Sequence, residues 1–477
     1  MRVYTILIHF IPLLFLSCSE SKEEIPVIEP EAYIETPLKE YTIITRESED
    51  SEPDIREAIE LLDGFLEEIN NLIRPEFLDI MQSRPVWLKL NLLPGGAAWY
   101  HPSSGWLSAN GHNPDKALSV EIANASNFIA WTELNQPYMV LHEMAHLIHH
   151  QYFGHDYHAI SNAFIEAKAS GKYESVPYFD GENTYERAAY AMENDQEFFA
   201  ELSEAYFGRN DYYPFDYDEL KEFDTLGFHL MESAWGAPPG KEHSRGITSP
   251  FEELGLDGFY KKYLDASGLP VISSWIVYDE ALLLTRDIVN HMVSGIPPEA
   301  LDRMIEDGVR VGVIGRNQIT SDMPEYSDLN EAFPGSPWDN YRGLGPTLAR
   351  PLASSGEENL LQLPGDIYAG ENILIHEFAH AIDLMGLRPT VEGFEDELLK
   401  AYDKAMEEGL WHNTYAAVNS EEYFAEGVQS WYNANRFADP PDGVHNHVNT
   451  REKLKEYDRR LYDLLAKYFP DDDPDFF

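Results

Sequence analysis

The chain has 477 residues, enough for two or three domains with sizeable cores, and its apolar content of 43% is typical of a globular protein. Its 84 acidic and 34 basic residues give a formal charge of −50. That charge argues against electrostatic binding to nucleic acid or to anionic lipid, so we expect no nucleic-acid partner. The simplest interpretation of the acidic excess is solubility in a salty medium.

The N-terminal segment 1–18 is predicted to be a signal peptide. Arg2 supplies a positive charge, and the apolar run 6–16 is too short to cross a bilayer. The run ends at Cys18, the single cysteine of the sequence, which makes a disulfide within one chain impossible and argues against a cysteine-ligated metal. The segment resembles a bacterial lipoprotein signal, although an ordinary signal peptide cleaved nearby is the alternative.

That resemblance implies that Cys18 is lipidated and that this anchor is the chain's only contact with a membrane. It also implies an exported protein, namely an outer-membrane or cell-surface lipoprotein of a Gram-negative bacterium. Residues 19–40 are polar, acidic and proline-containing, and we interpret them as a tether. Apart from the N-terminal run, the sequence contains no apolar stretch long enough for a transmembrane helix.

Strands and helices then alternate as far as the first metal-binding motif. The residues at 41–45 have β character, and 54–73 place apolar side chains on one face of a helix. A strand is predicted at 85–90, a Gly/Pro/Ser-rich loop at 94–115 and a short alternating strand at 118–122.

The chain contains the pattern His-Glu-x-x-His twice. In a helix, residues four apart lie on one face, so each His pair can bind one metal ion. The Glu between them lies near enough to act on a metal-bound water. The two copies are His142-Glu143-x-x-His146, within LHEMAHLIHH, and His376-Glu377-x-x-His380, within LIHEFAHAID.

The two motifs belong to a long, diverged internal repeat. Matching segments occur in the same order in both copies, which predicts two modules of one fold at 41–240 and 250–477. We expect the short strand around Val120 to correspond to a strand at 359–361. The paired segments are 75–81 with 298–304, 86–90 with 309–314, 197–201 with 422–426, and 219–224 with 453–458.

Each site needs a third protein ligand, because a catalytic zinc has three and keeps one position open for water. The best candidates are Glu197 and Glu422, on a second helix that would pack across the first. An isolated acidic segment would be interpreted as an exposed helix face, but here the flanks repeat in register with the motifs. The shared flanks are Tyr190 and Tyr415 seven residues before, Asn194 and Asn419 three before, and Glu201 and Glu426 one turn after. We expect the last pair to orient a ligand His.

The second motif, followed by Tyr415 and the segment 422–426, resembles the catalytic domain of anthrax lethal factor and its relatives, and the first copy has the same set. In these zinc peptidases two His and a distant Glu hold the metal, and a Tyr seven residues before that Glu faces the site. The resemblance implies an α+β fold with two tandem zincin-like modules, each with an HExxH helix and a second ligand-bearing helix. It implies one Zn²⁺ per module, held by His142, His146 and Glu197 in the first and by His376, His380 and Glu422 in the second.

From these roles we predict a zinc metalloendopeptidase that acts on a protein or peptide. Glu143 and Glu377 would be the general bases, and the phenols of Tyr190 and Tyr415 would stabilise the oxyanion. The strand around Val120 or Leu360 would form the upper rim of the cleft and pair with the substrate. The alternative is a zinc-binding surface lipoprotein in which one or both modules bind a protein partner without catalysis.

Overall fold

The computed structural model describes residues 32–92, 95–472, 474 and 476, and it has an α+β fold, as predicted. The predicted signal peptide 1–18, with Cys18, lies outside the described residues, as does most of the predicted tether 19–40. The end of that tether is wrong, because 33–38 form a strand whose six residues pair with the next strand.

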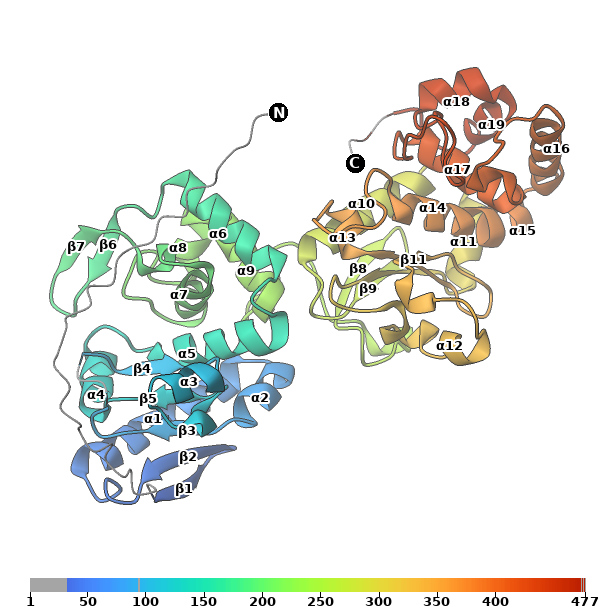
Figure 1. Ribbon diagram of the computed structural model, residues 1–477. Helices are drawn as coiled ribbons and strands as arrows, with labels where there is room; N and C mark the ends of the chain where they lie inside the picture. Colours follow the sequence, from blue (N-terminus) through green and yellow to red (C-terminus); the bar gives the residue numbers. More distant parts are fainter. Residues whose placement is uncertain (1–31, 93–94, 473, 475, 477) are drawn as a thin grey trace, which may run out of the picture.

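The first half of the chain starts with a five-stranded sheet and continues into a mainly helical region (Figure 1). Its strands are β1 (Tyr33–Leu38), β2 (Tyr41–Arg46), β3 (Val86–Leu88), β4 (Ala98–Tyr100), β5 (Val120–Ile122), β6 (Val176–Phe179) and β7 (Thr184–Arg187). Its α-helices are α1 (Pro53–Leu72), α2 (Pro75–Gln82), α3 (Ser104–Ala109), α4 (Ala125–Leu134), α5 (Met139–Ile148), α6 (His158–Ser170), α7 (Asp195–Phe207), α8 (Tyr217–Phe223) and α9 (Thr225–Trp235).

The second half has the same plan, a five-stranded sheet followed by helices (Figure 1). Its strands are β8 (Lys262–Ala266), β9 (Leu269–Ser273), β10 (Arg310–Ile314), β11 (Gly343–Leu344) and β12 (Leu352–Gly356). Its α-helices are α10 (Asp279–Val293), α11 (Pro298–Glu306), α12 (Leu329–Ala332), α13 (Glu357–Leu360), α14 (Ile373–Ala381), α15 (Arg388–Thr390), α16 (Phe394–Glu407), α17 (Ser420–Trp431), α18 (Arg451–Tyr457) and α19 (Arg459–Leu465).

The two sheets share one strand order and one set of strand directions. The first sheet has the order β1-β2-β3-β5-β4, and the second has the order β8-β9-β10-β12-β11. In each sheet the two outer pairings are antiparallel and the two inner pairings are parallel. The strands β4 and β11 are therefore equivalent edge strands. Each contacts the helix that carries the His-Glu-x-x-His motif of its half, α5 or α14.

Two expectations about strands are wrong. The residues at 359–361 are not a strand: α13 ends at Leu360, and the Asn359 side chain accepts a hydrogen bond from Ile373 N and donates to Glu371 O. The strand equivalent to β5 is β12, whose sequence Leu-Ala-Ser-Ser-Gly has little β propensity but is buried throughout. The strand around Val120 is not a rim either, because β5 pairs on both sides, with β3 and with β4.

Hydrophobic packing explains why these sequences form these elements. Helix α1 begins at Pro53, which suits the first helical turn, and buries one apolar stripe that includes Ile55, Leu62 and Ile69. The buried apolar side chains form two large clusters, one drawn almost wholly from the first half and one from the second. The module boundaries and the duplication itself stay predictions.

The halves also contact each other through polar groups. The Tyr157 hydroxyl donates to the Ile276 carbonyl at 2.9 Å, and Lys262 Nζ donates to the Ser233 carbonyl at 3.1 Å. The Arg74 guanidinium lies 3.7 Å from the centre of the Trp275 ring. Among the described residues, no helix combines the length and the apolar character needed to cross a membrane.

Candidate metal centres

Each His-Glu-x-x-His motif lies on a helix that packs against the helix carrying the predicted third ligand. Helix α5 carries the first motif and contacts α7, and α14 carries the second motif and contacts α17. The Asn three residues before each Glu is the N-cap of its helix. Asn194 accepts hydrogen bonds from the N–H of Glu197, and Asn419 from that of Glu422, which fixes each Glu in the first helical turn.

In the first half the three predicted ligands converge. Glu197 Oε2 lies 3.1 Å from His142 Nε2 and 3.3 Å from His146 Nε2. The three donor atoms lie within 4.8 Å of one another, as a shared metal ion requires. Burial alone would raise the pKa of Glu197, but its hydrogen bonds with the two His rings outweigh burial and lower it.

The second half repeats this geometry. Glu422 Oε2 lies 3.1 Å from His376 Nε2 and 3.3 Å from His380 Nε2, and these atoms also lie within 4.8 Å of one another. Two imidazole nitrogens and one carboxylate oxygen are the donor set of many catalytic zinc sites, so both groups fit Zn²⁺. Each group contains three donors among the described residues, which would leave a coordination position open.

The acids that follow the first His of each motif are shielded from water. Glu143 is buried and Glu377 is half-buried. Burial is the main cause that raises the pKa of each carboxyl, and the neighbouring His residues oppose it. A carboxylate held at a raised pKa is suited to accept a proton near neutral pH.

The predicted tyrosines stand at equivalent places beside the two groups. Tyr190 begins the short helix η3 (Tyr190–Met192), and Tyr415 begins η9 (Tyr415–Ala417), each just before the ligand-bearing helix. The Tyr415 ring stacks on His376 with centroids 6.1 Å apart. Burial, with the charge of Glu197, raises the pKa of Tyr190 to about 12, so its phenol keeps its proton and can donate it in a hydrogen bond.

The groups that contact Nδ1 of the predicted ligands His142 and His376 differ from those we expected. His142 Nδ1 lies 2.7 Å from Glu204, whereas the predicted Glu201 is 3.8 Å away. His376 Nδ1 lies 3.0 Å from the amide oxygen of Gln429, and the predicted Glu426 is 3.6 Å away. In both helices the orienting group stands two turns after the ligand, on the same face. His142, Glu201 and Glu204 themselves form a third group whose donor atoms lie within 4.8 Å of one another.

The first group lies in a cleft of about 630 Å³. The edge strand β4, within the predicted loop 94–115, supplies part of the wall through Trp99 and Tyr100. Tyr178 and Tyr212 line it from the side of β6, and Glu143, His146 and Tyr190 also line it.

Three further carboxylates gather at the His142 wall of this cleft, and sequence reasoning did not place them together. Glu201, Glu204 and Asp211 all line the cleft, and each is no more than 5% exposed. Burial, together with the charge of Glu204, raises the pKa of Asp211 to about 7. A motif search centred on 197–201 extends neither to Glu204 nor to the loop that carries Asp211.

In the second half, the segment after β11 comes close to the motif helix. A Cβ at Gly345 would lie 3.1 Å from Glu377 Oε2 and 3.2 Å from the Cβ of His380. Glycine at 345 thus permits an approach that a side chain would obstruct.

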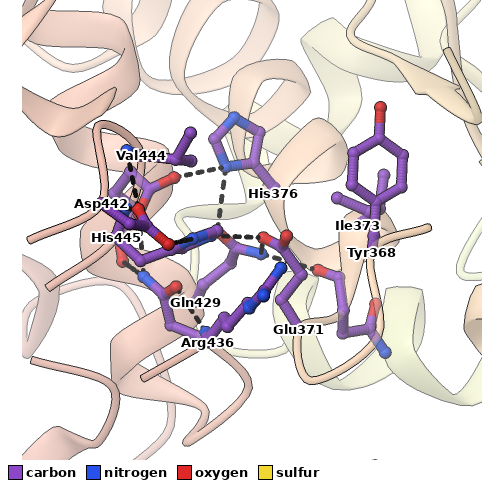
Figure 2. A network of polar contacts seen from close by, with 12 residues as sticks. Tyr368, Glu371, Ile373, His376, Gln429, Arg436, Asp442, Val444 and His445 are labelled. Atoms are coloured by element: carbon purple, nitrogen blue, oxygen red, sulfur yellow. Dashed lines mark hydrogen bonds and ion pairs between the residues drawn. The ribbon is translucent and has the colours of Figure 1, made fainter. Parts of the chain in front are cut away.

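Behind His376 lies a network of polar contacts. It joins Gln429 to Glu371 at 3.3 Å and Glu371 to His445 at 3.1 Å (Figure 2).

Comparison with known proteins gives little to add to this geometry. No family model and no curated protein matches the chain. One similar solved structure is the PRO-PRO endopeptidase (PPEP-2) from Paenibacillus alvei, at 20% identity and a TM-score of 0.28. The match covers 40% of this chain and 92% of that one.

Proposed function

We propose that this protein is a zinc-dependent metallopeptidase. The observation that carries the proposal is a His-His-Glu donor set beside a buried Glu143, in a cleft of about 630 Å³ that has room for a peptide. The same donor set recurs at His376, His380 and Glu422. Because both halves of a diverged repeat keep this uncommon arrangement, a metal role is better supported than by either occurrence alone.

Zinc is the metal that the donors favour. In the first half, His142, His146 and Glu197 would hold the ion, and in the second half the equivalent three residues would hold another. When bound with three protein ligands, zinc supplies Lewis acidity and lowers the pKa of a coordinated water toward neutrality. The resemblance to the lethal factor catalytic domain points to the same metal and to the same ligands.

The chain's own residues would handle the proton and the developing charge. Glu143 would accept a proton from the attacking water and pass it to the leaving amine. The protonated phenol of Tyr190 would donate a hydrogen bond to the oxyanion of the substrate carbonyl. The free edge of β4 would pair with an extended peptide through backbone hydrogen bonds, which replaces β5 as the rim we expected.

Glu377 and Tyr415 would have the same roles in the second half. A variant of the proposal has one active half and one that only binds substrate. The rival function is a zinc-binding surface lipoprotein that binds a protein partner without catalysis. Such structural zinc sites are normally closed by four protein ligands, usually with cysteine, and each donor group here has three ligands and no cysteine.

The decisive experiment is cleavage of a peptide library by four forms of the full chain: wild type, Glu143→Gln, Glu377→Gln and the double variant. Zinc content is measured on the same samples. Loss of a general base costs about 10²- to 10⁴-fold in rate, so the double variant should bind zinc and not cleave. Cleavage by a zinc-loaded double variant would contradict the proposed peptidase function.

Export and lipidation belong to the same proposal. If Cys18 carries lipid, the mature protein should partition into detergent and incorporate a labelled fatty acid, and Cys18→Ala should do neither. Protease treatment of intact cells would then separate an outward-facing anchor from a periplasmic one. A water-soluble wild-type protein without label would leave only the ordinary signal-peptide alternative.

A further inference from the structure

The two halves differ most at the wall behind the first His of each motif. The residues there occupy equivalent places, because Asn210 donates to Glu201 at 3.1 Å and Asn435 donates to Glu426 at 2.9 Å. The next backbone N–H then bonds to the same Asn in each half, from Asp211 at 2.8 Å and from Arg436 at 2.7 Å. The wall can therefore be compared position by position.

At that wall the first half has more acidic side chains than the second. Glu204 is matched by Gln429, and Asp211 is matched by Arg436, while Glu201 and Glu426 are both acidic. Among the described residues that line the first cleft there is no Lys or Arg. The nearby Arg187 lies over the rings of Tyr178 and Tyr212, and among the described residues no ion pair joins it to the three acids.

The hydrogen-bond partners of the three acids are also neutral. Asp211 accepts from the side-chain amides of Gln136, at 3.1 Å, and of Asn135, at 3.3 Å. Glu204 bonds to His142, which must itself be neutral to bind a metal through Nε2. Three carboxyl groups buried this close together are costly to ionise without a cation, so a positively charged occupant at this end of the cleft would be stabilised by them.

In the second half, a side chain of the protein itself lies beside the buried acids. Between α17 and α18 the chain runs through 432–450, whereas between α7 and α8 it runs only through 208–216. The longer segment brings in His445, which is 4% exposed and bonds to Glu371 at 3.1 Å (Figure 2). Burial would lower the pKa of His445, but Glu371 and Glu426 outweigh it and raise the pKa. The second half thus places a His beside its acids, and the shorter segment 208–216 of the first half contains no His.

We propose that Glu201, Glu204 and Asp211 form a specificity pocket that takes a Lys or Arg side chain of the substrate. One imidazole ring separates the pocket from the metal group, because His142 faces the metal ligands with Nε2 and Glu204 with Nδ1. A side chain of the residue next to the scissile bond spans that distance. The rings of Tyr178 and Tyr212 would flank its aliphatic stem.

This inference rests on the proposed peptidase function, and its test separates the two. The full chain with Glu377→Gln, which silences the second site, is given matched peptides that carry Lys, Arg, norleucine or Glu beside the cleavage point. We expect kcat/KM for Lys and Arg to exceed that for norleucine by roughly 10- to 100-fold, as for a buried charged hydrogen bond. The peptide with Glu beside the cleavage point should have the lowest kcat/KM.

Asp211→Asn keeps the shape of the side chain and removes the charge. It should reduce the Lys-to-norleucine ratio by about tenfold. Glu204→Gln should reduce the ratio as well, and the ratio is compared rather than the rate because Glu204 also orients His142. The exposed Glu182→Gln in the β6–β7 turn is the matched control and should keep the wild-type ratio.

A second measurement does not depend on catalysis. The full chain with Glu143→Gln should bind the Lys peptide about tenfold or more tightly than the norleucine peptide, and Asp211→Asn should remove the difference. Equal binding, or a preference that Asp211→Asn leaves intact, would overturn the pocket. A second divalent ion on His142, Glu201 and Glu204, seen as three metals per chain, would overturn it too. Absence of any cleavage with zinc bound would instead contradict the proposed function, while the binding comparison still decides the pocket.

Discussion

The two halves keep the same ligand geometry while the surroundings of the ligands differ. In both, a Glu oxygen lies 3.1 Å from one His nitrogen and 3.3 Å from the other. The partner of the first His is a carboxylate in the first half, Glu204, and an amide in the second, Gln429. The positions of the predicted ligands are fixed by two helices. The residues behind them, Glu204 and Gln429 on the same helices and Asp211 and Arg436 just after these helices, differ in charge between the halves.

The difference also separates an open site from a compensated one. The first half leaves three buried acids facing its cleft, and the second places His445 beside Glu371 within its own network. If both halves are peptidases, equal ligand sets would therefore not imply equal substrates.

The largest effect should come from the third ligand. Glu197→Gln and Glu422→Gln each replace a carboxylate oxygen donor with a weaker amide, so each should cost one zinc ion and leave the other half loaded. Metal analysis of the purified full chain should give about two zinc ions in the wild type and about one in each variant. Loss of both ions from one substitution would show that the halves are coupled rather than independent.

Acid should destabilise the first half through His149, which is buried with both ring nitrogens unpartnered. Burial lowers its pKa from 6.5 to about 3. Between pH 6.5 and 3 the His149 side chain is therefore protonated in the unfolded chain but neutral in the folded one. The free energy of unfolding is highest above pH 6.5 and falls as the pH drops toward 3. By pH 4 the loss should be about 3 kcal/mol.

Urea unfolding between pH 7.5 and 4 checks this loss. His149→Gln should flatten the pH dependence, and the exposed His412→Gln in the second half should not change it. A wild-type slope that His149→Gln leaves intact would assign the acid sensitivity to other groups. Asp383, the counterpart of His149, is paired with Arg388 at 2.7 Å, so the second half should be less sensitive.

The sequence predicted those helices and strands whose apolar side chains follow a regular period. The apolar stripe of α1 was predicted, since burial there follows the helical period. β5 was predicted from its alternating sequence, although all three of its residues are buried. β12 was missed because its Ser and Gly residues have low β propensity and form a strand only through tertiary pairing. β4 was included in the predicted loop 94–115, because its three residues stand within a Gly/Pro/Ser-rich stretch.

The candidate site could also be predicted only in part. The structure brings together the predicted ligands of each half, because helix geometry and an N-cap Asn fix them locally. Glu204 and Gln429 were missed as the partners of the His residues. Whether the residue one turn or two turns after the predicted ligand contacts the His depends on how the two helices cross, and the sequence does not show that angle. The contact of His445 with Glu371 spans a long loop, and no local pattern indicates it.

A smaller effect should follow from replacing the carboxylate that orients His142. Glu204→Gln copies the second half, and loss of such a partner typically weakens metal binding by about 10- to 100-fold. The measurement is zinc retention against a chelator in a chain whose second site is removed by Glu422→Gln. Glu182→Gln is the control, and an unchanged affinity would show that the carboxylate and the amide are equivalent partners.

The smallest effect should be at Gly345. Its replacement by Ala forces Glu377 or His380 to shift by a few tenths of an ångström, which should lower the activity of the second site by about two- to tenfold. Gly95→Ala, before β4, meets no atom within 4 Å and serves as the matched control. The measurement is kcat/KM in a Glu143→Gln chain, and an unchanged value would mean that the second site tolerates the methyl group.

The most direct test of the account is X-ray diffraction from crystals of the full chain at the zinc absorption edge. We predict two anomalous peaks, one between His142, His146 and Glu197 and one between His376, His380 and Glu422, each with a fourth position held by solvent. Peaks with four protein ligands, or no peak at either group, would contradict the claim that this protein carries two open zinc centres.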